Sequence, residues 1–149
     1  MTLPVNMETL ANITFHSCPS NLQQIRRQVR SITAAAGCNE EQVRKLVLVV
    51  EEAITNVMRH AYQGELTGEI KLVVARQADV LYFKLRDFAD PVDPGCIKPR
   101  DLSECRPGGL GVNLIDEVMD SWEFGRPDSG QGNVLTMTKS IERGIDERV

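Results

Sequence analysis

The chain has 149 residues, of which 42% are hydrophobic and 26% charged, and its formal net charge is −4 at pH 7. This length suits a single domain over residues 1–149, which buries roughly 70% of its surface on folding. The acidic balance argues against direct nucleic-acid binding, because such binding needs a basic face that neutralises phosphates.

The sequence predicts neither a secretory signal nor a membrane-spanning segment. Its longest strongly apolar run, Leu46 to Val50, is far shorter than the ~20 residues that span a bilayer. The N-terminus lacks a basic segment followed by an apolar one. Four cysteines without a CxxC pair and only two histidines give little support to a zinc site. We therefore expect a cytoplasmic protein with reduced thiols.

The first predicted elements are a strand and a helix. Residues 1–15 are expected to form an arm or an edge strand, because apolar side chains gather in the second half of this segment. A helix follows Pro19, with apolar residues at three- and four-residue spacing until Gly37 ends it. This helix carries three arginines, Arg26, Arg27 and Arg30. They either form a solvated helix face, which is the commoner role, or bind an acidic partner.

A second helix is predicted to begin at Asn39 and to run to about Ala61, ending before Gly64. Asn39 is a favourable N-cap, and Gln42 three residues later completes the pattern of a capping box. In that motif each of the two side chains binds the backbone N–H of the other residue.

The chain then predicts a β-hairpin followed by a long loop. Apolar residues alternate with more polar ones over 70–74 and 80–86, and residues 77–79 form the turn between them. The loop over residues 88–107 contains four prolines, Pro91, Pro94, Pro99 and Pro107. Loops of this length are usually functional lids or disordered segments.

The remaining elements are a third helix, which follows the glycines at 108, 109 and 111, and a second hairpin. Residues 122–124 and 134–141 form the strands of this hairpin, and residues 128–130 form its turn. The whole pattern predicts an α+β fold, a two-layer α/β sandwich with three helices on one face of a mostly antiparallel sheet.

The second helix carries the first candidate site. Glu52, Asn56 and His60 are four residues apart, so they project from one face of the helix. A carboxylate beside a carboxamide offers a proton acceptor next to an oxygen ligand of the kind that Mg²⁺ prefers. Taken alone, this pattern is most often an ordinary solvated helix face.

Two further segments suggest a bound nucleotide. Asp87 stands where a strand ends, where a carboxylate accepts a hydrogen bond from an exocyclic amine such as that of adenine, although aspartate there commonly only initiates a turn. The glycines of residues 107–112 precede a helix, whose N-terminal N–H groups bind anions. The same glycines equally suit a flexible hinge, since they match neither the P-loop nor the Rossmann pattern.

The order of these motifs resembles the GHKL (Bergerat) ATP-binding fold and, within it, the serine-protein kinase anti-sigma factors of bacterial partner-switching systems. The most specific matches are EAITNVMRHAY from Glu52 to Tyr62 and GGLGVNLIDEVMD from Gly108 to Asp120. Gly132-Asn133 before the last strand is a weaker match.

The resemblance implies a role for each matched residue. Asn56 would coordinate Mg²⁺, Glu52 would be the general base or its organiser, and Asp87 would bind the adenine amine. His60 would line the pocket or pack against it. Residues that cradle the phosphates would be Gly108, Gly109, Leu110, Gly111 and Val112.

The resemblance also implies an ATP lid over residues 88–107. Asp93 lies within this loop and would contribute to nucleotide binding, and any of the three cations of the loop, Lys98, Arg100 and Arg106, would be able to reach the γ-phosphate. The family usually has glycines after the adenine-binding aspartate, whereas this chain has Ala89 and Pro91, which restrict the backbone.

The activity implied is ATP- and Mg²⁺-dependent phosphorylation of a serine on an anti-sigma-factor antagonist, together with sequestration of a sigma factor by a homodimer. One alternative is a nucleotide-binding regulatory switch without efficient kinase activity. Another is the ATPase part of a histidine kinase separated from its phosphoacceptor. Against the latter, His16 lies in the expected N-terminal strand and not on a helix.

Overall fold

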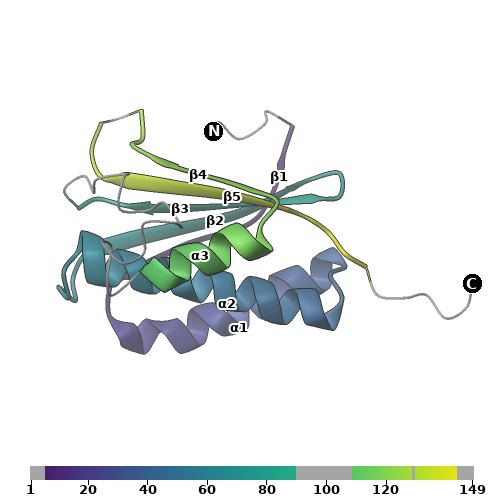
Figure 1. The fold of residues 1–149 in the computed structure, drawn as a ribbon, viewed down its shortest axis with the longest axis horizontal. Coiled ribbons are helices and arrows are strands. Elements are labelled where there is room, and N and C mark those ends of the chain that lie inside the picture. Colours follow the sequence, from purple (N-terminus) through teal and green to yellow (C-terminus); the bar gives the residue numbers. More distant parts are fainter. Residues whose placement is uncertain (1–5, 90–108, 129, 144–149) are drawn as a thin grey trace, which may run out of the picture.

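The computed structural model describes residues 6–89, 109–128 and 130–143. Within these ranges the chain forms one antiparallel five-stranded sheet with three α-helices on one of its faces (Figure 1). The predicted α+β sandwich is therefore confirmed.

The strands are β1 (Glu8–His16), β2 (Glu69–Gln77), β3 (Val80–Asp87), β4 (Ser121–Gly125) and β5 (Asn133–Ser140). They lie in the order β1-β2-β3-β5-β4, so β1 is an edge strand as predicted. Both predicted hairpins are confirmed, since β2 pairs with β3 and β4 with β5, in each case antiparallel.

Helix α1 (Leu22–Ala36) follows a short 3₁₀ turn, η1 (Pro19–Asn21). Its apolar spacing places Ile25 and Val29 in the core. Gly37 ends the helix as predicted, because it adopts the left-handed conformation (φ 108°) that glycine tolerates and the N–H of Cys38 donates to the carbonyl of Thr33.

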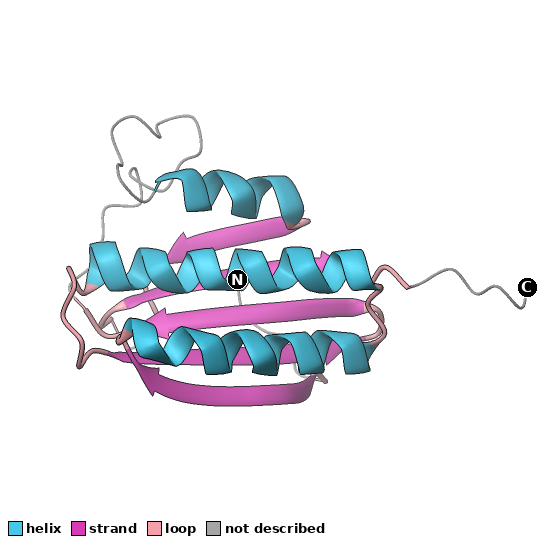
Figure 2. Cartoon of the chain, turned by 90° about the horizontal axis from the view of Figure 1, so that it is seen from below, coloured by secondary structure: helices cyan, strands magenta, loops and turns pink. Residues whose placement is uncertain are grey.

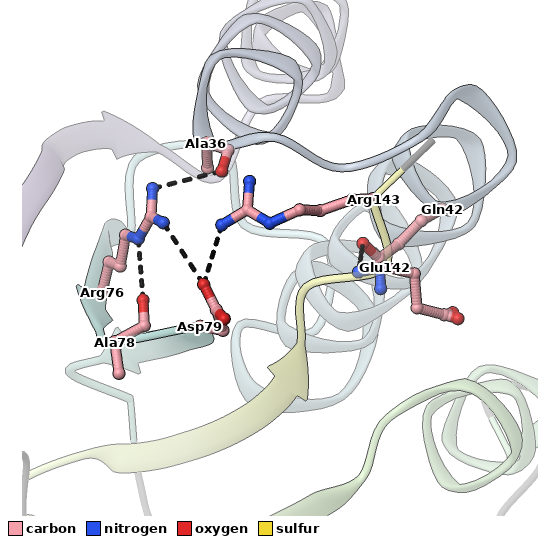
Figure 3. A network of polar contacts seen from close by, with 7 residues as sticks. All are labelled: Ala36, Gln42, Arg76, Ala78, Asp79, Glu142 and Arg143. Carbon is pink, nitrogen blue, oxygen red and sulfur yellow. Dashed lines mark hydrogen bonds and ion pairs between the residues drawn. The ribbon is translucent and has the colours of Figure 1, made fainter. Parts of the chain in front are cut away.

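Helix α2 (Glu40–Asn56) begins with the predicted cap, since the Asn39 side chain accepts a hydrogen bond of 2.8 Å from the N–H of Gln42. The second half of the predicted capping box is wrong. Gln42 is buried against the end of β5, where it donates to the Ser140 carbonyl (2.8 Å). Its side-chain oxygen accepts from the Glu142 N–H at 2.7 Å (Figure 3). The Asn39 N–H donates instead to the Glu142 carbonyl.

The helical segment continues to Ala61 as predicted, but its last part, η2 (Val57–Ala61), is a π-helical turn. The N–H of Tyr62 donates to the carbonyl of Val57, five residues earlier, at 3.0 Å. Single π turns of this kind occur frequently at functional sites.

Helix α3 (Gly109–Val118) packs beside α2, which in turn packs beside α1 (Figure 2). The glycines at 109 and 111 lie inside this helix, so the predicted helix start is too late. Glycine is unfavourable in a helix interior, but the N–H groups of the first turn have no intrahelical partner anyway, so this position is tolerated.

The core lies between the helices and the sheet. Its fully buried side chains come from both layers and include Leu46, Ile54, Ile70, Leu72, Leu81, Phe83, Leu85, Ile115 and Met137. In the described ranges, each helix is too short or too polar to cross a membrane.

Candidate functional site

Three element ends lie at the same end of the molecule in both views: the C-terminal end of α2 with η2, the end of β3, and the N-terminal end of α3 (Figures 1 and 2). Contacts between α2 and α3 support this arrangement. The sequence motifs that carry the candidate residues therefore converge, although the chain separates them widely.

Asn56, the last residue of α2, is half-buried and has a distinctive environment. Its Oδ1 atom is buried and has no hydrogen-bond partner among the described residues. Buried polar atoms nearly always have a partner, so an unpaired oxygen points to a missing ligand, ion or water. A neutral carboxamide oxygen suits Mg²⁺, and the half-buried Glu52 lies one helical turn away.

His60 lies in the π turn and not in the regular part of the helix. Its Nε2 atom is also buried without a hydrogen-bond partner in the described part of the chain. Burial, followed by the positive charge of Arg59, lowers the pKa of His60, which favours a neutral imidazole at pH 7. Because the π turn is wider than an α turn, His60 does not continue the α-helical spacing of Glu52 and Asn56.

Asp87 ends β3 and is only 2% exposed. Its Oδ1 atom accepts hydrogen bonds of 3.0 Å from the Asn133 side-chain amide and from the N–H of Ala89. Burial raises the pKa of Asp87, and these hydrogen bonds oppose that rise. The hydrogen bond from the N–H of Ala89, two residues later, is the one that an aspartate makes when it initiates a turn, and the Asn133 amide adds a donor from β5. Asp87 therefore initiates a turn, and its buried carboxyl is held at one oxygen.

Gly132 and Asn133 have a clear role beside Asp87. A Cβ atom on Gly132 would lie 1.9 Å from the Asp87 carbonyl oxygen, and Gly132 has a positive φ of 83°. Glycine is therefore required on two grounds, close approach and backbone conformation. The two residues of the weaker family match, Gly132 and Asn133, thus both contact Asp87.

The glycine-rich segment supplies Gly109, Leu110, Gly111 and Val112 to the first turn of α3. Backbone N–H groups in the first turn of a helix have no intrahelical partner and can bind an anion, aided by the helix dipole. The other predicted phosphate and lid residues lie outside the described residues: Asp93, Lys98, Arg100, Arg106 and Gly108. Pro91 also lies outside them, whereas the backbone of Ala89 is placed against Asp87.

Sequence reasoning assigned no role to Tyr62. Its hydroxyl donates to the Glu69 carbonyl (2.6 Å) and accepts from the Phe88 N–H (2.8 Å), so it connects the end of η2 to the residue after Asp87. Spacing cannot reveal a contact between residues 26 positions apart. The only available signal was the position of Tyr62 at the end of the matched string.

Comparison with known proteins shows the family to which the chain belongs. Residues 15–139 match the family described as the histidine kinase-like ATPase domain, and the chain belongs to this family. It is therefore a member of the GHKL class, as the sequence motifs predicted.

The curated relatives include several serine-protein kinases named RsbW. The protein from Listeria monocytogenes serovar 1/2a is 33% identical over 131 residues, which cover 82% of each chain. The protein from Halalkalibacterium halodurans is 33% identical over 136 residues, covering 84% of this chain and 80% of the relative. The Staphylococcus aureus protein is 26% identical over 132 residues, covering 80% and 79%.

Proposed function

We propose that this chain is an ATP-dependent serine-protein kinase that also acts as an anti-sigma factor. It phosphorylates a serine of an anti-sigma-factor antagonist and sequesters a sigma factor when the antagonist is released. Family membership and the names of the relatives support this function. The structural observation that carries it is the buried Oδ1 of Asn56, which has no hydrogen-bond partner among the described residues. Asn56 ends α2, and this end of α2 lies at the end of the molecule where β3 ends and α3 begins (Figures 1 and 2).

The residues present fit Mg²⁺ and ATP. Asn56 would hold the metal through its side-chain oxygen, which is the only ligand of the proposed ion that we assign to the chain. When bound, Mg²⁺ neutralises charge on phosphate oxygens. The backbone of residues 109–112 would bind the phosphates, together with Gly108 and the lid cations.

Asp87 would hold the adenine ring through its exocyclic amine. The carboxyl cannot turn away from the ring, because Asn133 and Ala89 fix one of its oxygens. His60, whose Nε2 atom is buried without a partner in the described part of the chain, would line the nucleotide site as a neutral imidazole.

Glu52 is the proposed general base. Its half-buried carboxylate would take the proton of the incoming serine hydroxyl as the serine oxygen bonds to the γ-phosphorus and ADP leaves. Phosphoryl transfer depends mainly on positioning and on neutralising charge, which the metal ligand and the α3 N-terminus provide.

The remaining parts of the proposal concern location and assembly. We place the protein in the cytoplasm, where a sigma factor and its antagonist act. We expect a homodimer to which the edge strand β1 contributes, with the sheet face opposite the helices available for pairing (Figure 1). Sedimentation equilibrium at micromolar concentration tests this assembly, and a monomer would contradict it.

The decisive experiment is phosphorylation of the antagonist. The purified chain is incubated with Mg-ATP and a small antagonist domain encoded beside it, and phosphoserine is measured by mass spectrometry. Phosphoserine on the antagonist is expected, with none in a reaction without ATP. If ATP binds but no phosphoserine forms, the protein is a nucleotide switch and the kinase proposal is wrong.

A further inference from the structure

The Tyr62 hydroxyl occupies an unusual place between two strands. β2 and β3 are antiparallel with Ile70 opposite Asp87, so Glu69 and Phe88 form the next facing pair beyond the ladder. The Tyr62 hydroxyl lies between them, donating to the Glu69 carbonyl and accepting from the Phe88 N–H. A side chain from the end of η2 thus bridges the strand ends where Asp87 leaves the sheet.

The backbone from Asp87 to Ala89 is held from several sides. The Ala89 N–H donates to the Asp87 carboxyl, and the Phe88 N–H donates to Tyr62. The Phe88 ring lies against two cations, with the guanidinium of Arg86 4.5 Å and the Lys71 ammonium 5.7 Å from its centre. Among these contacts, only the one made by Tyr62 connects this backbone to the end of η2, the helical turn that follows directly after Asn56.

Gly68 lies against this ring and leaves room for it because it has no side chain. A Cβ atom on Gly68 would lie 2.4 Å from a ring carbon of Tyr62, so any larger residue there would displace the ring. The ring is therefore held by shape, and its hydroxyl is held by two backbone groups. The hydroxyl is a donor at neutral pH, since the ordinary pKa of tyrosine is 10.0 and burial raises the pKa of Tyr62 further.

We infer that Tyr62 is a positioning residue for the purine end of the nucleotide site. It fixes the backbone that carries Asp87 relative to the helix that carries Asn56, so that one nucleotide meets both residues. This inference rests on the proposed function, since it assumes that Asp87 binds adenine. The inference predicts that Tyr62 affects the preference for adenine over guanine and does not affect the affinity for the phosphates.

The test compares Tyr62→Phe with Tyr82→Phe, which removes the hydroxyl of the other tyrosine, on β3. Calorimetry with Mg²⁺ measures the affinities for ATP, GTP and inorganic triphosphate. Tyr62→Phe is expected to lose about tenfold in ATP affinity, because the backbone that carries Asp87 is then less well ordered before the base binds. Triphosphate affinity should stay unchanged, so the preference for ATP over GTP falls. Tyr82→Phe should match the wild type in all three affinities.

Gly68→Ala provides a second variant that keeps the hydroxyl but displaces the ring, and the same selective loss is expected. An unchanged ATP-to-GTP ratio in both variants would overturn the inference. An equal loss for all three ligands would also overturn it, because a merely structural role predicts that result. If the wild type itself binds no adenine nucleotide, the proposed function fails and the inference fails with it.

Discussion

Asn56 has a buried oxygen for which the described chain offers no partner. Replacing Asn56 with alanine removes this oxygen without breaking a described hydrogen bond, so the free energy of unfolding should stay constant or rise slightly. Affinity for ATP in the presence of Mg²⁺ should fall roughly 100-fold, because a metal ligand is lost. Calorimetry with and without Mg²⁺ measures this, with the exposed Asn6→Ala as the control. Unchanged affinity would remove Asn56 as the metal ligand.

Glu52 is expected to act in transfer and not in binding. Glu52→Gln keeps the shape of the side chain but cannot accept the serine proton, so phosphorylation should slow by about 10²–10⁴-fold. The dissociation constant for ATP should change by no more than about twofold, since the lost interaction belongs to the transition state. Single-turnover phosphorylation and calorimetry separate the two effects. A variant that still phosphorylates at the wild-type rate would exclude Glu52 as the base.

Asp87 gives stability a predictable pH dependence. Its pKa in the folded protein is raised above the ordinary value of 3.8, chiefly by burial. The stabilisation that the protonated form provides is therefore fully present below about pH 4 and is lost as pH rises through the raised pKa. The asparagine of Asp87→Asn cannot ionise. The free energy of unfolding of this variant, relative to that of the wild type, should therefore increase as pH rises. Urea unfolding of both proteins from pH 4 to pH 7 measures this gain, and parallel curves would contradict the raised pKa.

Among the elements, the β4–β5 connection supports the end of β3. Gly132→Ala places a methyl group against the Asp87 carbonyl and also strains a positive φ, so we expect a loss of at least about 3 kcal/mol. Gly130 has the same sign of φ (82°), but a Cβ there meets nothing within 4 Å. Gly130→Ala should therefore cost only about 1 kcal/mol. Chemical denaturation compares the two, and equal losses would show that the close contact with Asp87 is unimportant.

The elements also show which features the sequence can predict. Local signals were sufficient for α1, both hairpins and the Asn39 cap, because apolar spacing, Gly37 and a cap residue act over a few positions. The π turn has no comparable sequence signal. The side-chain role of Gln42 was mispredicted because its partners lie 98 and 100 positions away, beyond any local rule. In the candidate site, the motifs predicted which residues to consider, and their roles stay predictions, whereas the bridge made by Tyr62 had no sequence signal.

At the scale of the whole molecule, polar contacts join the helices to the sheet at the end opposite the candidate site (Figures 1 and 3). Asp79, in the β2–β3 turn, pairs with Arg143 at 2.8 Å and with Arg76 at 3.6 Å. Arg76 also donates to the Ala36 carbonyl at the end of α1. Together with Gln42, these residues tie α1, α2 and the chain after β5 to one hairpin.

The two parts of this network should differ in strength. Asp79 is largely exposed, and exposed ion pairs contribute about 0–1 kcal/mol, so Asp79→Ala should cost less than about 1 kcal/mol. Gln42 is buried, and Gln42→Ala leaves a carbonyl and an N–H without partners, so about 2–3 kcal/mol should be lost. Denaturant unfolding measures both, and ATP affinity should stay unchanged in each variant because the site lies at the other end. A larger loss of unfolding free energy in Asp79→Ala than in Gln42→Ala would contradict this ranking.

The π turn makes the length of one short segment matter more than its composition. A π turn contains one residue more than an α turn, and here the extra residue lies between Val57 and Tyr62, whose N–H donates to the Val57 carbonyl. Deleting one residue between Val57 and Ala61 would convert the segment to an α turn in which the same N–H and carbonyl still pair, so the Tyr62 ring would keep about its present direction. An inserted residue would instead turn this ring away from Glu69 and Phe88, and is therefore expected to weaken binding of the base although every side chain named above remains in the sequence.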